Sequence, residues 1–148
     1  MAAPDFQEFD HTADAGIRIH GNSLEALFIN AARGMFSLLL PEAARTQLVQ
    51  DTEGERIEIP IAVRAPDLAL LLREWLGELL YQYSTERVYF TDFFLDSVEE
   101  THIRARAAGV RFTQQLESQL AEIKAVTYHG LEVIRQPDGY HAQVIFDI

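Results

Sequence analysis

Two segments with a helical repeat of apolar residues, set among segments in which apolar and polar residues alternate, constrain the fold of this chain more than any other feature. The first helical segment covers residues 23–40. Its apolar stripe consists of Leu24, Leu27, Phe28, Ala31, Met35 and Leu38. Ser23 is a suitable N-cap, Glu25 suits the first turn, and Pro41 ends the helix. Gly34 disfavours helix, so we expect it to mark close packing.

The second helical segment covers residues 66–86 and starts at Pro66 or Asp67. Its buried face is predicted to contain Leu68, Leu71, Leu72, Trp75, Leu79 and Tyr83. Because this segment is so apolar, we expect it to lie centrally in the fold. We interpret its stripe as core packing and not as a cofactor site.

Alternation with a period of two, which indicates half-buried β-strands, occurs around both helical segments. In residues 16–21, Ile17 and Ile19 alternate with polar residues. Residues 57–64 alternate in the same way, and Pro60 favours an edge position or a bulge.

Three further segments follow the second helix. Residues 87–100 are rich in aromatic side chains and residues 101–112 alternate, so both are predicted strands. Residues 113–122 are polar and fit either a short helix or a connecting loop.

The C-terminal part of the chain, residues 122–148, predicts a β-hairpin. Two β-rich runs flank the sequence Pro-Asp-Gly, which is a strong turn signal. If Gln136 faces Tyr140, the register is defined to within a residue or two. The pairs expected from this register are Asp147 with His129, and Ile148 with Tyr128.

The predicted hairpin gathers charged groups at the end of the chain. Asp147 supplies a side-chain carboxylate and Ile148 the α-carboxylate, and two adjacent anionic groups are good ligands for a hard cation. Lys124 is expected just past the paired residues, close enough for its long side chain to reach back.

Composition narrows the possible functions. The 148 residues fit one domain, 1–148, that can bury a core without crosslinks. The absence of cysteine excludes disulfides and thiolate metal sites and agrees with a cytoplasmic location. The net charge of −11 repels nucleic-acid backbones, so we expect metal ions and basic protein surfaces as partners and no direct nucleic-acid binding. We expect no signal peptide and no membrane partner, because the N-terminal residues lack an apolar region and the apolar runs are short.

An acidic segment precedes the first predicted strand. Residues 5–14 contain Asp5, Asp10 and Asp14 together with His11. Because Asp is a poor strand former, this polar segment is either a turn or a site. Capping a turn is the more common role for a single Asp, and we interpret Asp10 in that way.

Five sequence blocks together resemble the archease family. In order, they are DHTADAGIRIHG, SLEALFINAARGMFSLL, LLREWLGELLY, AEIKAVTYHGLEV and the closing VIFDI. They extend over essentially the whole chain, and the combination of HTAD, IKAVTYH and a final DI is specific. The chain departs from the family pattern at Ala15, where valine is more familiar, and at Gly130, where a larger residue is more usual.

The resemblance implies an α+β fold, in which two helices pack on a β-sheet of a strand-helix-strand-strand module with an additional β region. It also implies a function as an accessory factor, not itself an enzyme, of a GTP- and metal-dependent RNA ligase in tRNA splicing and RNA repair. Such a factor promotes guanylylation of the ligase's histidine and allows multiple turnover.

The resemblance further implies a divalent cation, with Ca²⁺ preferred and Mg²⁺ or Mn²⁺ as alternatives. Its ligands would be Asp14, Asp147 and Ile148, and Lys124 would take part in ligase activation. For a hard, oxygen-preferring cation, we interpret His11 and His129 as supporting or packing groups rather than ligands.

Two other function classes stay open. A metal held by three carboxylates could activate water for phosphoester hydrolysis, although the sequence shows no phosphate-cradling glycine loop and no nucleophile–base pair. A general chaperone or adaptor is also compatible with the acidic surface, and it predicts that partner binding survives loss of Asp147. Taken singly, Asp147 could be an ordinary exposed acid and Lys124 a solvated residue in a weak ion pair.

Overall fold

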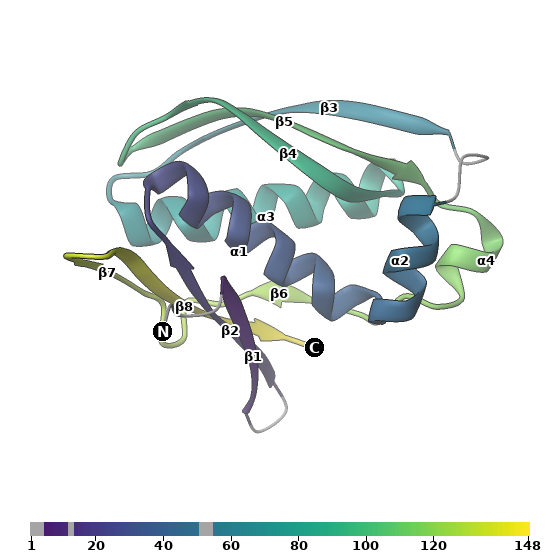
Figure 1. Ribbon diagram of the computed structural model, residues 1–148, viewed down its shortest axis with the longest axis horizontal. Coiled ribbons are helices and arrows are strands. Elements are labelled where there is room, and N and C mark those ends of the chain that lie inside the picture. The colour runs from purple at the N-terminus through teal and green to yellow at the C-terminus, as the bar shows by residue number, and fades with distance from the viewer. Residues whose placement is uncertain (1–4, 12–13, 51–54) are drawn as a thin grey trace.

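Two antiparallel sheets enclose a layer of two long helices in the computed structural model, which describes residues 5–11, 14–50 and 55–148 (Figure 1). The helices are α1 (Leu24–Leu39) and α3 (Leu68–Glu86). One sheet has the order β1 (Phe6–His11), β2 (Asp14–Gly21), β8 (Gly139–Asp147) and β6 (Ala125–Val126), and β7 (Glu132–Gln136) also pairs with β8. The other sheet has the order β3 (Arg56–Arg64), β5 (His102–Arg111) and β4 (Val88–Val98). Two shorter helices are α2 (Glu42–Gln50) and α4 (Gln114–Glu117).

The predicted α+β class is confirmed by this arrangement. The additional β region is a second sheet, so the two long helices pack between two sheets (Figure 1). The predicted hairpin corresponds to β7 and β8.

Both long helices begin where the sequence predicts. The hydroxyl of Ser23 accepts a hydrogen bond from the backbone N–H of Ala26 at 3.1 Å. The carboxylate of Asp67 accepts one from the N–H of Leu70 at 2.9 Å, so Asp67 is the N-cap of α3. After α3, Arg87 adopts a left-handed conformation with φ of 56°, which ends the helix.

The core is a hydrophobic cluster to which the helices and both sheets contribute. Trp75 of α3 is fully buried, and its indole N–H donates to the carbonyl of Phe28 on α1 at 2.9 Å. Phe36 of α1 contacts the rings of Tyr83 and Tyr89 edge-on. The hydroxyl of Tyr89 donates back to the carbonyl of Phe36 at 2.6 Å. These contacts fix α1 against α3 on one side and β4 on the other.

The predictions for Gly34 and Pro60 are confirmed. A Cβ atom on Gly34 would lie 3.0 Å from Cδ1 of Ile17 and 3.2 Å from Cγ of Phe6, so α1 packs closely on β1 and β2. Pro60 lies in β3, which is an edge strand of its sheet.

Two elements, β1 and α2, were not identified from the sequence. β1 forms a hairpin ladder with β2, in which the pair formed by His11 and Asp14 lies closest to the turn. The acidic segment is therefore a strand as well as a turn. In α2, Leu48 is a buried apolar residue, but the helix has little apolar periodicity. In residues 113–122 the short helix α4 forms, capped by the hydroxyl of Thr113.

The predicted register of the C-terminal hairpin needs correction. Gln136 pairs with Gly139, one residue away from the expected Tyr140. Further along, the residues between β6 and β7 leave the ladder in a turn that contains Gly130, whose φ is +58°. Asp147 consequently pairs with Ala125. The expected pairs of Asp147 with His129 and of Ile148 with Tyr128 are wrong, because the prediction treated the strand as continuous through this turn.

Among the described residues, no single helix is both long and apolar enough to cross a membrane. α1 and the segment Glu42–Leu48 meet the same criteria only as a pair, across a bend of 110°.

Candidate functional site

The two ends of the sequence meet in the ladder between β2 and β8. Asp14, the first residue of β2, is the direct Cα partner of Asp147, the last residue of β8. Directly opposed residues of antiparallel strands have Cβ atoms about 5 Å apart and project from the same face of the sheet. The two carboxylates predicted to share a cation are thus placed side by side.

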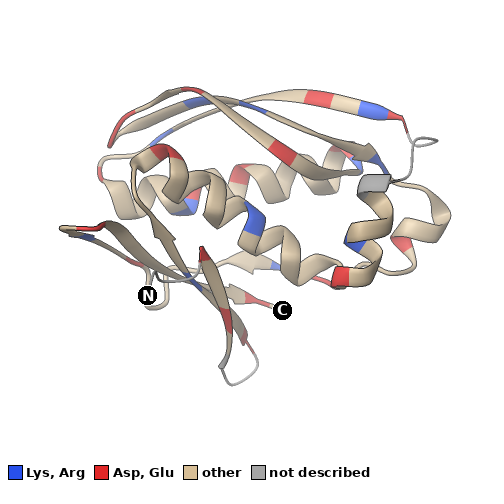
Figure 2. Ribbon diagram, in the orientation of Figure 1, with Lys and Arg blue, Asp and Glu red and all other residues tan. Residues whose placement is uncertain are grey.

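That shared face points away from the helices. Ile17 and Ile19 of β2 are buried in the core, so the alternate residues of the strand belong to the opposite face. This second face carries Asp14 and Arg18. In Figure 2, an acidic segment marks the end of β8 next to the C-terminal label. On this outer face Asp147 is exposed and Asp14 is half-buried.

β6 completes the surroundings of Asp147 on the other side of β8. The backbone N–H of Lys124 donates to the carbonyl of Asp147 at 2.7 Å, and Ala125 pairs with Asp147. Lys124 was expected beside the end of the chain, and its backbone does lie there. The register differs from the expected one, because Asp147 pairs with Ala125 and not with His129.

Lys124 directly precedes β6, and continued strand alternation places its side chain on the side of Val126, opposite the face of Asp147. Val126, two residues on, is buried toward the helices, whereas Ala125 shares the face of Asp147. In agreement, Lys124 lines an open groove of about 500 Å³ between α3 and β6, together with Glu74 and Glu78. Lys124 is also the only lysine in the sequence, since the other 11 basic residues are arginines.

The surface next to Asp14 is shaped by an aromatic contact. A Cβ atom on Gly16 would lie 2.3 Å from Cζ of Phe9, so the Phe9 ring covers the strand at this point. The guanidinium carbon of Arg18 lies 4.3 Å from the centroid of the same ring. Phe9 and Arg18 thus pack against each other on the outer face of β2.

The donor atoms of the carboxylate pair suit a hard divalent cation. Asp14 and Asp147 offer carboxylate oxygens, which Ca²⁺, Mg²⁺ and Mn²⁺ prefer over nitrogen and sulfur. Ile148 follows Asp147 directly and is exposed. His129 is exposed in the turn after β6, where its backbone N–H donates to the hydroxyl of Thr127 at 3.2 Å. The side chains of Asp10 and His11 lie outside the described residues, so their predicted roles stay predictions.

The chain was compared with known families and structures. The model of the Archease protein family (MTH1598/TM1083) matches residues 6–148. The chain is 35% identical to Protein archease of Methanosarcina barkeri over 147 residues, with 97% of this chain and 95% of the relative aligned. It is 36% identical to Protein archease of Methanothermobacter thermautotrophicus over 146 residues, with 97% of this chain and 98% of the relative aligned.

Two solved structures share the fold. One is the solution structure of Methanobacterium thermoautotrophicum protein 1598, with a TM-score of 0.73, 31% identity, and coverage of 97% of this chain and 99% of that chain. The other is the crystal structure of a Thermotoga maritima archease described as a possible chaperone, with a TM-score of 0.57 and 22% identity over 100% of this chain and 98% of that chain. Because the family model and the curated relatives match nearly the full length, this chain belongs to the archease family.

Proposed function

We propose that this protein is an accessory factor of a GTP- and metal-dependent RNA ligase in tRNA splicing and RNA repair, and that it acts in the cytoplasm. It promotes guanylylation of the ligase and allows multiple turnover. The family membership supports this proposal, and one observation carries it. Asp14 and Asp147, from distant parts of the sequence, are direct partners in the β2–β8 ladder, and the backbone N–H of Lys124 donates to the carbonyl of Asp147.

Asp14, Asp147 and the α-carboxylate of Ile148 are proposed to bind a divalent cation, with Ca²⁺ first and Mg²⁺ or Mn²⁺ as alternatives. When bound, the cation would neutralise carboxylates that otherwise repel one another and would offer its remaining coordination positions to the partner. The protein's own contribution is preorganisation. The ladder already holds Asp14 and Asp147 side by side, so little conformational entropy is lost on binding.

Lys124 is proposed to supply a compact positive charge to the ligase or to its nucleotide. Its backbone is fixed by the hydrogen bond to Asp147, while the groove beside it leaves room for a partner group. An ammonium group is a point charge with rotatable donors, whereas a guanidinium is a planar fork. Lys124→Arg therefore keeps the charge and changes its geometry, which makes it a sharper test than Lys124→Ala.

The net charge of −11 supports a basic protein partner rather than direct contact with RNA. Opposite charges on the two proteins would steer their encounter. The association rate should therefore fall as salt is added.

The test compares single-turnover and multiple-turnover RNA ligation by the cognate ligase, with and without this protein. The variants are Asp14→Ala and Asp147→Ala, and the matched control is Asp92→Ala. Asp92 is an exposed aspartate on β4 of the other sheet, 3.9 Å from Arg56, so its loss changes the net charge equally.

We expect wild type and Asp92→Ala to support repeated turnover, and the two site variants to lose the stimulation while remaining folded at the assay temperature. If Asp147→Ala stimulates as well as wild type, the site is wrong, and a general chaperone becomes the better account. Metal-dependent phosphoester hydrolysis without any ligase, abolished in Asp147→Ala, would instead indicate a hydrolase.

A further inference from the structure

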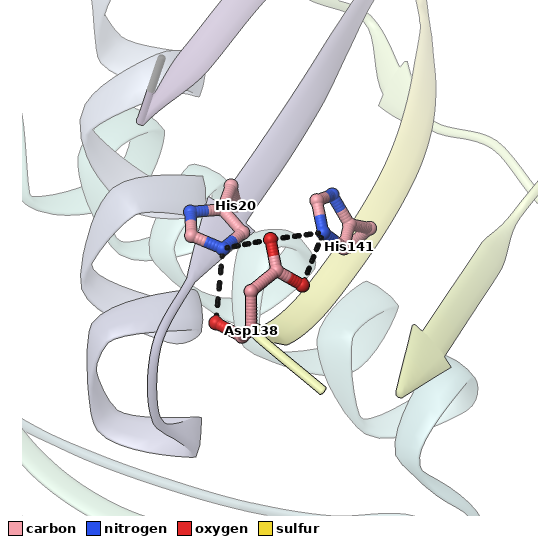
Figure 3. A group of neighbouring side chains, drawn as sticks. All are labelled: His20, Asp138 and His141. Carbon is pink, nitrogen blue, oxygen red and sulfur yellow. Dashed lines mark hydrogen bonds and ion pairs between the residues drawn. The ribbon is translucent and has the colours of Figure 1, made fainter. Parts of the chain in front are cut away.

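A second group of metal-binding side chains lies at the other end of the β2–β8 ladder (Figure 3). His20 on β2 and His141 on β8 are direct Cα partners, and Asp138 comes from the tight turn before β8. His20 and Asp14 are six positions apart on β2, which corresponds to about 20 Å along the strand. This group is thus separate from the carboxylate pair.

Both imidazole rings direct the same nitrogen atom toward one carboxylate. Nε2 of His141 lies 3.1 Å and 3.2 Å from the two carboxylate oxygens of Asp138. Nε2 of His20 lies 3.4 Å from one of those oxygens and 3.3 Å from the backbone carbonyl oxygen of the same residue. The three potential ligand atoms all lie within 4.8 Å of one another.

These separations fit the coordination sphere of a small transition metal. Zinc binds histidine nitrogen and carboxylate oxygen at about 2.0–2.2 Å, so two ligand atoms at a tetrahedral centre are about 3.4 Å apart. The same carboxylate oxygen, Oδ2 of Asp138, lies 3.2 Å from Nε2 of His141 and 3.4 Å from Nε2 of His20, which is at or slightly below this value. A hydrogen bond between one histidine and the carboxylate would explain the position of only one imidazole. The second imidazole faces the same carboxylate, as two ligands of one metal ion would.

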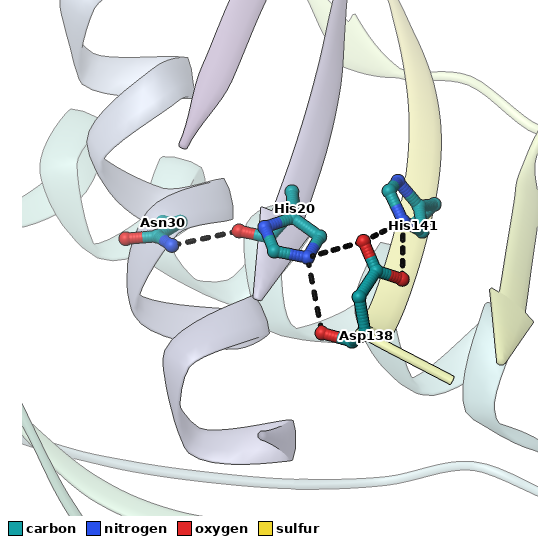
Figure 4. Close-up of polar contacts among 4 residues, drawn as sticks. All are labelled: His20, Asn30, Asp138 and His141. Carbon is teal, nitrogen blue, oxygen red and sulfur yellow. Dashed lines mark hydrogen bonds and ion pairs between the residues drawn. The ribbon is translucent and has the colours of Figure 1, made fainter. Parts of the chain in front are cut away.

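The surrounding backbone holds the three residues in place (Figure 4). The amide of Asn30 on α1, itself nearly buried, donates to the carbonyl of His20 at 2.8 Å. The turn approaches β2 closely at Gly139, which has a φ of +128°, and a Cβ atom there would lie 2.3 Å from the carbonyl oxygen of Gly21. Only glycine suits this position, and it brings Asp138 between the two histidines.

The site is also accessible. The side chains of His20 and His141 are 17% and 32% exposed, and that of Asp138 is 59% exposed. An ion can therefore enter from solvent. The chain has no cysteine, so no thiolate competes for the metal.

We propose that Nε2 of His20, Nε2 of His141 and the carboxylate of Asp138 bind a nitrogen-preferring divalent transition metal, represented by Zn²⁺. The fourth position is left to water or to a side chain of a partner. Two imidazole ligands favour Zn²⁺, Co²⁺ or Ni²⁺ over Ca²⁺ and Mg²⁺. The protein thus has two cation sites of different chemical preference on one sheet.

The test is a calorimetric titration of the full-length, metal-stripped protein with Zn²⁺, carried out with saturating Ca²⁺ present. The variants are His20→Gln, His141→Gln and Asp138→Asn. The matched control is His102→Gln, because His102 lies 3.7 Å from the carboxylate of Glu99 and, within the part of the chain that the structure describes, belongs to no group of three metal-binding side chains. We expect one tight site in wild type and in the control, and at least about tenfold weaker binding in each of the three variants.

A second measurement does not depend on substitution. The ring-nitrogen NMR signals of wild-type protein are recorded during the same Zn²⁺ titration. The Nε2 signals of His20 and His141 should shift together at one equivalent of metal, while those of His102 stay in place. Binding that is unchanged in His20→Gln and His141→Gln, or ring signals of these two residues that do not respond to Zn²⁺, would overturn the proposal.

Discussion

Replacing Asp147 by asparagine should have opposite effects on stability with and without metal. Asp147 and Asp14 are direct ladder partners, so their Cβ atoms lie about 5 Å apart, a separation that also sets the scale for their carboxylates. Two like charges at that distance repel by about 1 kcal/mol in water and by about 3 kcal/mol at an effective dielectric constant of about 20. Because Asp147 is exposed, the lower value applies. Asp147→Asn should therefore raise the melting temperature of metal-free protein by roughly 2–4 °C.

With metal present, the order should reverse. A ligand at 100 times its dissociation constant stabilises the folded state by about 2.7 kcal/mol, which corresponds to roughly 5–10 °C for a chain of this length. Wild type should gain this stability in saturating Ca²⁺, whereas Asp147→Asn should gain little, because it has lost a carboxylate ligand. Asp147→Asn should thus melt above wild type in EDTA and below wild type in Ca²⁺.

The assay is thermal unfolding followed by circular dichroism in EDTA, Ca²⁺ and Mg²⁺, at low ionic strength. Asp92→Asn serves as the control, because it removes a charge from the other sheet and should respond to metal as wild type does. The reasoning is refuted if Asp147→Asn melts below wild type in EDTA, or if Ca²⁺ stabilises the variant as much as wild type.

Three further predictions concern the fold and its ionisation. Trp75→Phe should lower the free energy of unfolding in urea by about 2–3 kcal/mol, because it leaves a cavity and removes the donor to the Phe28 carbonyl. Burial, followed by the charge of Glu117, raises the pKa of Tyr83 to about 12, so the folded state keeps a proton that the unfolded state loses above about pH 10. The stability contributed by Tyr83 should be complete below pH 10 and disappear as the pH approaches 12, and Tyr83→Phe should reduce this alkaline loss in unfolding curves. Gly139→Ala should destabilise the protein by about 1–3 kcal/mol in the same urea assay, because its left-handed φ and the nearby Gly21 carbonyl leave no room for a side chain. An unchanged urea midpoint in Trp75→Phe or Gly139→Ala, or an unchanged alkaline loss in Tyr83→Phe, would contradict these predictions.

Local sequence patterns predicted most of the helices and strands. The stripe that includes Leu27 and Met35 and the one that includes Leu72 and Trp75 both face the core, and the caps at Ser23 and Asp67 are used as expected. These features depend on residues a few positions apart, which is why one sequence suffices to predict them.

Features that depend on tertiary pairing were harder to predict. β1 contains acidic residues that disfavour strands and forms because it pairs with β2. The end of the hairpin register was wrong because Gly130 takes the chain out of the ladder, a turn that alternation alone does not indicate. Tertiary context outweighed local preference in both cases.

The two candidate sites differ in how far the sequence indicates them. Asp14 and Asp147 were identified through the family resemblance, and the ladder places them together. His20 and His141 are 121 positions apart, and nothing in the sequence alone pairs β2 with β8. The usable signal was the position of His20 on the polar face of its strand, combined with the Pro-Asp-Gly turn that carries Asp138.

The most direct measurement of the central claim is the covalent guanylylation of the ligase with labelled GTP, after one round of ligation has emptied it of nucleotide. The account predicts rapid re-guanylylation with wild type and with Asp92→Ala, and almost none with Asp14→Ala or Asp147→Ala at equal concentration. Equal re-guanylylation with all four proteins would show that the carboxylate pair joining the two ends of the chain does not activate the ligase.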